Sequence, residues 1–455
     1  MPHIQALFSN IYFIICASAI VALGLSLRMY PVIIYVALKR RLTDAPEERK
    51  SHFTEVPNLG GVGLYLAFSL VMILFGMTVA LDRPELLQLL SVLGATMILL
   101  FLGIKDDLVL LSPRKKFVGQ IIAAGIVIFM TDVRITSFDG LLGVNELPYM
   151  ASVLFTFFVF LLVVNAYNLI DGIDGLAGTI ATISSVSFGI FFVLNEQLFL
   201  AMVSFALIGA VIGFLRFNFS MTHKLFMGDS GSLFIGYLLA YQGIAFLGVN
   251  ESATATFVIA KAPILLLAVL SFPLLDTLRV FILRAREGRS PLSADRNHIH
   301  HRLLDIGLNH KQATLFITFC NVLLIGLVLA MGDLYINVQL LISVSVGVIL
   351  YLLPFSKVFD KESPPVVIKS TLVEEENWTH AHADYRLAQK IVQSRKSPIE
   401  KATDDKTNTK IQTLVVEEGD KEVNISPMRK IISKRLAALK KFRKTSTSHQ
   451  KVGHR

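Results

Sequence analysis

Four polar side chains recur at three-residue spacing between two strongly apolar stretches of the sequence. They are Asn165, Asn168, Asp171 and Asp174, within the segment NAYNLIDGIDGLAG. In a helix this spacing would place all four on one slowly drifting stripe, and the glycines that repeat beside them would let a helix or a ligand approach closely. A carboxylate at the centre of a bilayer costs roughly 2.5 to 3.5 kcal/mol even on a lenient scale. We therefore interpret the stripe as part of a functional site rather than as helix packing.

Two other carboxylate motifs indicate phosphate or cation chemistry. Asp106 and Asp107 are adjacent, and adjacent carboxylates repel each other unless a metal ion or a proton compensates their charge. A solvated loop of mixed charge is the alternative. Asp229 lies between two glycines in FMGDSGS, in a turn that we expect to open a helix at Ser230. The free amides of such a helix start bind phosphate oxygens, and an ordinary helix cap is the alternative.

A basic segment from Arg284 to Lys311 supplies the opposite charge. Its centre, ADRNHIHHRL, contains three histidines between two arginines: Arg296, His298, His300, His301 and Arg302. These side chains concentrate hydrogen-bond donors suited to a diphosphate. A zinc site is the alternative, but the segment contains no cysteine and its arginines would disfavour a second cation.

The elements that must position these side chains are membrane helices. Mean hydropathy is +0.61 and only 17% of the residues are charged, well below the roughly 25% of soluble domains. Apolar windows of about 20 residues, the length that spans a bilayer, are centred near Val21, Leu70, Met97, Ile126, Phe158, Ser187, Ile208, Leu239, Val269, Leu323 and Val346. We expect an all-α, polytopic membrane bundle of about eleven transmembrane helices. Both cysteines fall within expected spans, so neither a disulfide nor a zinc framework is indicated.

Positive charge in alternate loops predicts the orientation of these spans. Lysines and arginines cluster at 39–50, 105–116, 216–224 and 284–311, whereas the other loops carry little beyond Arg83, Arg134 and Lys261. By the positive-inside rule the first set is cytoplasmic, the N-terminus is outside and the C-terminal tail is inside. The polar motifs above, together with His52 and Asp276, would then all lie at the cytoplasmic face.

The last part of the chain has a different composition. Between Lys361 and Arg455 there are 20 basic and 12 acidic residues, so +8 of the formal net charge of +9 lies there. We expect a transmembrane catalytic domain at 1–358 and a basic cytoplasmic tail at 359–455 that is mostly disordered. Residues 427–444 have the pattern of an amphipathic helix that would lie on an anionic leaflet, and a solvated basic segment is the alternative.

Carboxylates for a divalent ion, cations for phosphates and a bilayer for a lipid are typical of one kind of enzyme. Together they fit magnesium-assisted transfer between a nucleotide diphosphate and a membrane lipid. An ion-coupled transporter is the rival from another class, but it predicts acids near mid-span with access from both faces. A non-catalytic scaffold would leave the convergent polar motifs unexplained.

Six motifs in order carry a resemblance to a known family. VPNLGGVG, KDD, NAYNLIDGIDGLAG, FMGDSGS, PLLDT and ADRNHIHHRL, spread over about Ile11 to Phe355, resemble the polyprenyl-phosphate N-acetylhexosamine-1-phosphate transferases of glycosyltransferase family 4. That family includes bacterial enzymes that initiate O-antigen, enterobacterial common antigen and teichoic acid linkage synthesis, and HIHH resembles its hexosamine-phosphate branch. The resemblance implies transfer of N-acetylglucosamine 1-phosphate from UDP-N-acetylglucosamine (UDP-GlcNAc) to undecaprenyl phosphate with release of UMP. This would initiate a cell-surface polysaccharide such as lipopolysaccharide, and another UDP-N-acetyl sugar is the alternative donor.

The resemblance also implies roles for individual residues. Asp229 and Asn168 would coordinate Mg²⁺, with Mn²⁺ as the alternative ion, and Asp106 and Asp107 would position or deprotonate the lipid phosphate. The residues at the nucleotide sugar and its diphosphate would be Lys116, Asp171, Asp174, Asp276, Arg296, His298, His300, His301 and Arg302. Many members carry an acidic or amide residue where this chain has Leu110. We therefore do not extend the acidic site beyond Asp106 and Asp107.

The same resemblance implies the partners and the location. The partners would be UDP-GlcNAc, undecaprenyl phosphate and membrane lipid, with no nucleic acid, and a homodimer is compatible with the family. The enzyme would be a multi-pass protein of the bacterial inner membrane with its active site facing the cytoplasm. The tail lies outside the family core and the resemblance assigns it nothing.

Overall fold

The structure is a computed structural model, and it describes residues 10–40, 42–44, 56–79, 81–109, 111–289, 298–356, 368–372, 411–418 and 421–423. The chain divides into two compact units, Met1–Phe359 and Asp360–Arg455. Several predicted features lie outside the described residues: His52, Leu110, Arg296 and the tail helix at 427–444.

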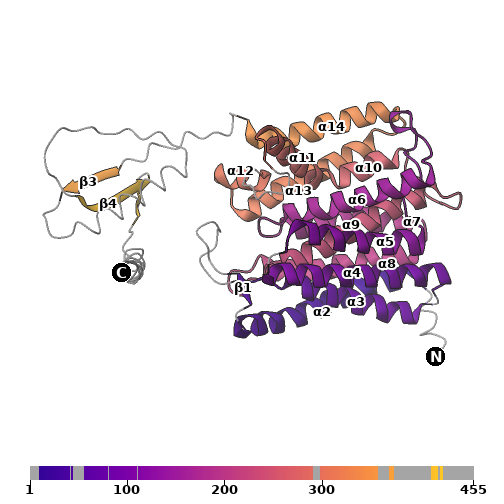
Figure 1. Ribbon diagram of the computed structural model, residues 1–455, viewed down its shortest axis with the longest axis horizontal. Coiled ribbons are helices and arrows are strands. Elements are labelled where there is room, and N and C mark those ends of the chain that lie inside the picture. Colours follow the sequence, from indigo (N-terminus) through magenta and orange to yellow (C-terminus); the bar gives the residue numbers. More distant parts are fainter. Residues whose placement is uncertain are drawn as a thin grey trace, which may run out of the picture. The chain divides into compact units, whose positions relative to one another are not determined.

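The first unit is a bundle of helices that run side by side, from α2 and α3 at one edge to α14 at the other (Figure 1). The helices are α2 (Ile11–Arg40), α3 (Gly60–Thr78), α4 (Arg83–Val109), α5 (Pro113–Thr131), α6 (Tyr149–Ile170), α7 (Leu176–Leu194), α8 (Leu198–Asn218), α9 (Gly228–Glu251), α10 (Ala262–Val269), α11 (Ser271–Arg286), α12 (Ile299–Asp305), α13 (His310–Ala330) and α14 (Ile336–Leu352). Two 3₁₀ turns, η1 (Leu141–Gly143) and η2 (Leu353–Phe355), and a short antiparallel pair, β1 (Thr43–Asp44) with β2 (Val56–Pro57), complete the described part of this unit.

The membrane bundle expected from hydropathy is confirmed. Within the described residues, nine helices are long and apolar enough to cross a membrane, and α10 with α11, bent by 71°, makes a tenth if the pair is one span. All eleven expected window centres fall in helices, but α5 falls short of the composition of a span because its first turn carries Arg114, Lys115 and Lys116. The expected number of about eleven therefore exceeds this count by one.

The tail contains strands, which its composition did not predict. In the second unit, β3 (Ile368–Leu372), β4 (Ile411–Glu418) and β5 (Lys421–Val423) form an antiparallel sheet in the order β3-β4-β5. Within the described residues the tail thus contains regular structure, whereas its charged composition predicted disorder.

Helix α9 forms the centre of the bundle. In its most apolar 18-residue window 89% of the residues are buried, against 28% in α2, and it packs against α3, α4, α6 and α7. Glycines let two of these neighbours approach its first turn closely: a Cβ added at Gly61 would lie 2.1 Å from the amide nitrogen of Gly231, and one at Gly103 would lie 2.2 Å from Cα of Ser230. Backbone contact at these points brings the carboxylates near the end of α4 to the start of α9.

The polar stripe predicted between Asn165 and Asp174 is not one continuous helix. α6 ends at Ile170, Asp171 is its C-cap residue, and α7 begins only at Leu176. Gly175 has a left-handed φ of 79°, a conformation that glycine adopts without strain. Asn165 and Asn168 therefore lie on α6, whereas Asp171 and Asp174 lie in the turn that follows.

The break between α10 and α11 is stabilised from a neighbouring helix. Backbone carbonyls freed by a break inside a membrane need partners. The side-chain amide of Asn321 in α13 donates to the carbonyl oxygen of Ala268 at 2.9 Å and to Oγ of Ser271 at 3.1 Å. The bend thereby directs α11, which carries Asp276, toward the end of the bundle where α12 lies (Figure 1).

Candidate active site

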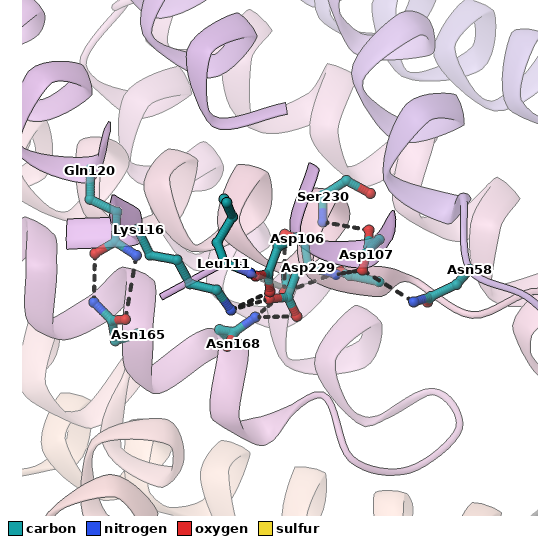
Figure 2. Close-up of polar contacts among 12 residues, drawn as sticks. Asn58, Asp106, Asp107, Leu111, Lys116, Gln120, Asn165, Asn168, Asp229 and Ser230 are labelled. Atoms are coloured by element: carbon teal, nitrogen blue, oxygen red, sulfur yellow. Dashed lines mark hydrogen bonds and ion pairs between the residues drawn. The ribbon is translucent and has the colours of Figure 1, made fainter. Parts of the chain in front are cut away.

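A lysine ammonium bridges two carboxylates at the centre of the site. Nζ of Lys116, from the first turn of α5, lies 2.6 Å from Oδ2 of Asp229 and also contacts Oδ2 of Asp106 (Figure 2). The other oxygen of Asp106 accepts a hydrogen bond from the backbone N–H of Leu111. Asp106 is only 6% exposed, whereas Lys116 and Asp229 are 25% and 28% exposed. The ammonium and Asp229 therefore form the accessible part of the cluster.

Asp107 lies behind this cluster and caps α9 from another helix. Its Oδ1 accepts from the amide of Asp229 at 2.8 Å and from the side chain of Asn58 at 3.1 Å, and its Oδ2 accepts from the amide of Ser230 at 3.2 Å (Figure 2). The amides that we expected to receive a phosphate are thus occupied by Asp107. A carboxylate at a helix start is also favoured by the helix dipole, so Asp107 fixes the position of Asp229.

The two asparagines of α6 connect this cluster to its neighbours. The Nδ2 group of Asn168 donates to Oδ1 of Asp229 at 3.1 Å and to Oγ of Ser232 at 2.7 Å. Asn165 forms a reciprocal amide pair with Gln120 of α5, at 2.7 and 3.3 Å (Figure 2). Because Gln120 follows Lys116 by one helical turn, the pair keeps Lys116 and Asn168 facing the same carboxylate. Gln120 was not among the predicted residues, although this spacing was visible in the sequence.

Asp171 is a carboxylate without a hydrogen-bond partner among the described residues. Burial raises the pKa of Asp171 to about 7, and the negative charges of Asp229, Asp107 and Asp174 add to the effect. Such an uncompensated acid beside Asp229 suits a divalent cation. Within the described residues there is no group of three histidine, cysteine or acidic side chains arranged to hold a metal.

Asp174 is fully engaged by basic partners. Its Oδ2 lies 2.7 Å from Nζ of Lys224 and 2.9 Å from Nδ1 of His310. Burial alone would raise the pKa of Asp174, but the hydrogen bonds from His310 and Lys224 outweigh it and the pKa falls below its ordinary value. Thr314 of α13 also donates to its backbone carbonyl, at 3.0 Å. The charge of Asp174 thus holds the turn after α6 to α13. The histidine in this contact, His310, was not predicted because it lies nine residues after His301, outside the histidine motif.

The predicted histidines form one stacked group at the start of α12. The rings of His298 and His300 are parallel with centroids 5.5 Å apart, and those of His300 and His301 are 4.3 Å apart. The ring of His300 lies on Gly172, where an added Cβ would meet its Nε2 at 2.1 Å. Burial and the neighbouring His301 lower the pKa of His300 to about 3, so this imidazole is neutral at physiological pH. Among the residues that the structure describes, none is a hydrogen-bond partner of its buried Nδ1.

Asp276 supports this group rather than facing the carboxylate cluster. It is 1% exposed, its Oδ2 accepts from Nδ1 of His298 at 2.7 Å, and its Oδ1 accepts from the amide of Ile299 at 2.8 Å. Arg302, in the last turn of α12, donates from Nε to the carbonyl oxygen of Pro354 at 3.0 Å.

A cavity of about 610 Å³ joins the two groups. Its polar lining residues include Lys116, Asn168, Arg284 and the three histidines, and its apolar ones, from α5, α6 and α11, include Phe117, Phe158, Leu161, Leu162 and Phe281. A cavity lined by both charged donors and hydrocarbon side chains suits a ligand that has an anionic head and a lipid chain.

Comparison with known proteins gives a consistent assignment. A model of the family described as glycosyl transferase family 4 matches residues 89–247. Over 288 residues, 60% of this chain and 71% of the relative, the chain is 32% identical to decaprenyl-phosphate N-acetylglucosaminephosphotransferase of Mycolicibacterium smegmatis. It is 30% identical to undecaprenyl-phosphate alpha-N-acetylglucosaminyl 1-phosphate transferase of Salmonella typhi, over 64% of this chain and 77% of the relative. It is also 30% identical to a probable undecaprenyl-phosphate N-acetylglucosaminyl 1-phosphate transferase of Bacillus subtilis, over 67% and 81%.

Proposed function

Because the chain belongs to the polyprenyl-phosphate N-acetylhexosamine-1-phosphate transferases of glycosyl transferase family 4, and is thus a glycosyl-1-phosphate transferase and a multi-pass membrane protein, we propose its substrates. The donor is UDP-GlcNAc and the acceptor is undecaprenyl phosphate. The products are undecaprenyl-diphosphate-GlcNAc and UMP.

One observation carries this proposal: the bridged carboxylate–lysine cluster contributes Lys116 to a cavity that is lined by the three histidines and by many apolar side chains. Lys116 belongs to both, since it contacts Asp106 and Asp229 and also lines the cavity. A phosphate on a hydrocarbon chain can place its charge at Lys116 and its chain along the apolar walls. The relatives described above are each named as a decaprenyl- or undecaprenyl-phosphate transferase, which supports the same acceptor.

The reaction we propose is a direct displacement at phosphorus. An oxygen of the lipid phosphate attacks the sugar-bearing phosphorus in line, a new P–O bond forms, and the bond from that phosphorus to the UMP oxygen breaks. Lys116 neutralises charge shared between the attacking and leaving oxygens, and such preorganised charge dominates phosphoryl transfer. His298 and His301 orient the diphosphate, and the neutral His300 contributes hydrogen bonding rather than charge.

The carboxylates would hold the divalent ion of this reaction. Asp229 and the unpartnered Asp171 are the proposed ligands, and Asn168 steadies Asp229 through its 3.1 Å hydrogen bond. When bound, Mg²⁺ supplies charge neutralisation on the donor phosphates. Asp107 keeps its oxygens on the α9 amides and acts by fixing Asp229.

The orientation of the enzyme is part of the same proposal. The site lies at the bundle end that carries the basic residues Lys105, Arg114, Lys224 and Arg284, and the positive-inside rule makes that end cytoplasmic. A cytoplasmic nucleotide sugar would then reach the site directly, in the inner membrane of a bacterium that initiates a cell-surface polysaccharide.

The test is a transfer assay with purified protein. Labelled UDP-GlcNAc and undecaprenyl phosphate, with Mg²⁺, should give a labelled lipid and an equal amount of UMP. UDP-N-acetylgalactosamine in a parallel reaction tests the alternative donor, and Asp229→Asn is the inactive control. Failure to release UMP from any UDP-N-acetyl sugar in the presence of the lipid would exclude the proposed substrates.

A further inference from the structure

The end of α14, which none of the six motifs includes, contacts Asp276 of α11. The hydroxyl of Tyr351 donates to Oδ1 of Asp276 at 2.7 Å. That oxygen also accepts from the amide of Ile299, and the other accepts from His298. Tyr351 is 2% exposed and Asp276 is 1% exposed. The phenol is therefore the donor from α14 that completes the set of hydrogen bonds around a buried carboxylate.

A buried carboxylate is stable only when hydrogen bonds compensate its lost hydration. Here the donors come from three elements: the His298 side chain ahead of α12, the first amide of α12, and Tyr351 of α14. The ring of Tyr351 is fixed between Phe272 and Phe355, with centroids 6.3 and 6.0 Å away. A fixed phenol leaves Asp276 with one orientation, and Asp276 in turn sets the orientation of the His298 ring.

A second set of contacts holds the other end of α12 to the same segment. Nε of Arg302, in the last turn of α12, donates to the carbonyl oxygen of Pro354 in η2. The guanidinium of Arg279 on α11 lies 3.9 Å from the ring centroid of Phe355, so η2 also contacts α11. α12 has only seven residues, far fewer than an isolated helix needs for stability. Its position must therefore come from its neighbours: Asp276 of α11, which Tyr351 contacts, accepts hydrogen bonds at the start of α12, and Pro354 of η2 accepts one from its last turn.

We infer that Tyr351 is a positioning residue of the transfer reaction, which holds His298 and the start of α12 at the cavity by acting through Asp276. The inference rests on the proposed function, because it assigns to His298 the binding of the donor diphosphate. Tyr351 touches neither substrate in this arrangement.

The test starts with Tyr351→Phe, which removes only the hydroxyl. In the transfer assay we expect kcat/KM for the nucleotide sugar to fall about tenfold, the effect of one lost hydrogen bond to a charged group, while KM for undecaprenyl phosphate changes by less than about twofold. A merely structural defect would not separate the two substrates. Tyr241→Phe is the matched control, since this buried phenol donates to Gln88 at 3.1 Å, far from the histidines along α9, and it should behave as wild type.

A double-mutant cycle tests the route through Asp276. In an Asp276→Asn background, Tyr351→Phe should lower kcat/KM by less than about twofold further. A full additional loss of about tenfold would show that the phenol does not act through Asp276 and would overturn the inference.

Two non-natural residues keep the test valid if Tyr351→Phe is recovered unfolded. 4-Aminophenylalanine at position 351 retains a donor and should restore kcat/KM to within about threefold, whereas 4-fluorophenylalanine, which cannot donate, should not. Equal activity of the two variants would refute the inference. Absence of transfer by the wild-type enzyme would instead refute the proposed function, so the two failures are distinguishable.

Discussion

At the scale of residues, the site is organised by charge compensation. Lys116 is shared by Asp106 and Asp229, Asp174 is held by Lys224 and His310, and Asp171 has no such partner in the described part of the chain. A buried acid without a counter-charge is costly, so it persists where a ligand supplies the charge. Under the proposed function, Asp174 belongs to a structural ion pair, whereas Asp171 is a ligand of the divalent ion.

Lys116 is expected to be indispensable for turnover. Lys116→Met removes the ammonium that lies between two carboxylates and lines the cavity. We expect kcat to fall by at least about 100-fold, as it does when other preorganised charge donors are removed. Lys115→Met, which changes an exposed neighbour, should keep wild-type activity in the same UMP-release assay. Comparable loss in both variants would contradict a specific role for Lys116.

The raised pKa of Asp171 predicts how stability depends on pH. A carboxyl group whose pKa is raised from 3.8 to about 7 by burial stabilises the fold most below its unfolded-state pKa, and this contribution is lost as pH rises through about 7. The unfolding temperature of the metal-free protein should fall between pH 5 and pH 8, and added Mg²⁺ should restore it at the upper end. Asp171→Asn should flatten both responses in thermal unfolding measurements. If the variant kept the pH profile of the wild-type protein, Asp171 would not be a ligand of the divalent ion.

At the scale of elements, the site depends on backbone contacts between helices. α4 and α3 reach the first turn of α9 because Gly103 and Gly61 have no side chain. The pairing of Asp107 with the α9 amides is possible only at this distance. The carboxylate cluster is therefore a consequence of how three helices pack.

Two glycines of α4 offer a matched comparison. Gly103→Ala would place a Cβ 2.2 Å from Cα of Ser230, whereas nothing lies within 4 Å of a Cβ at Gly94. Gly103→Ala should push α4 away from α9 and lower kcat by more than about tenfold, because small displacements of catalytic groups are costly. Gly94→Ala should be neutral or stabilise the helix by up to about 1 kcal/mol. Activity and thermal unfolding of both variants in detergent would check this, and normal activity of Gly103→Ala would contradict it.

At the scale of the whole molecule, the described site residues all belong to the unit Met1–Phe359. Residues 361–455 of the second unit carry +8 of the net charge of +9. The family model matches residues 89–247, which lie in the first unit, so we expect the role of the second unit to be separate from the chemistry.

Removal of the tail tests that separation. A chain that ends at Phe359 keeps Tyr351 and Pro354, which contact Asp276 and Arg302. We therefore expect its kcat and both of its KM values to lie within about threefold of those of the full-length enzyme. Loss of turnover in a truncated enzyme that remains folded, as judged by size-exclusion chromatography, would show that the tail takes part in catalysis.

The sequence by itself determined the class of the protein and most of the participating residues. Hydropathy located the helices because each must bury about 20 apolar residues in the bilayer, and the six motifs identified the family. Residue types and spacing also singled out Asp106, Asp107, Asn168 and Asp229, since polar groups in an apolar chain are conspicuous.

Only the tertiary structure decided what each polar group does. Asp107 caps α9 from 122 positions away, Lys116 reaches Asp229 across 113 positions, and Tyr351 completes the shell of Asp276 across 75. Local periodicity contains no information about such partners, because they are set by the packing of helices that are distant in the chain. The same limit explains why the stripe at Asn165–Asp174 looked like one helix: the spacing of its polar residues suits a helix, and the turn after Ile170 follows from glycine geometry and from the contacts of Asp174 with α13.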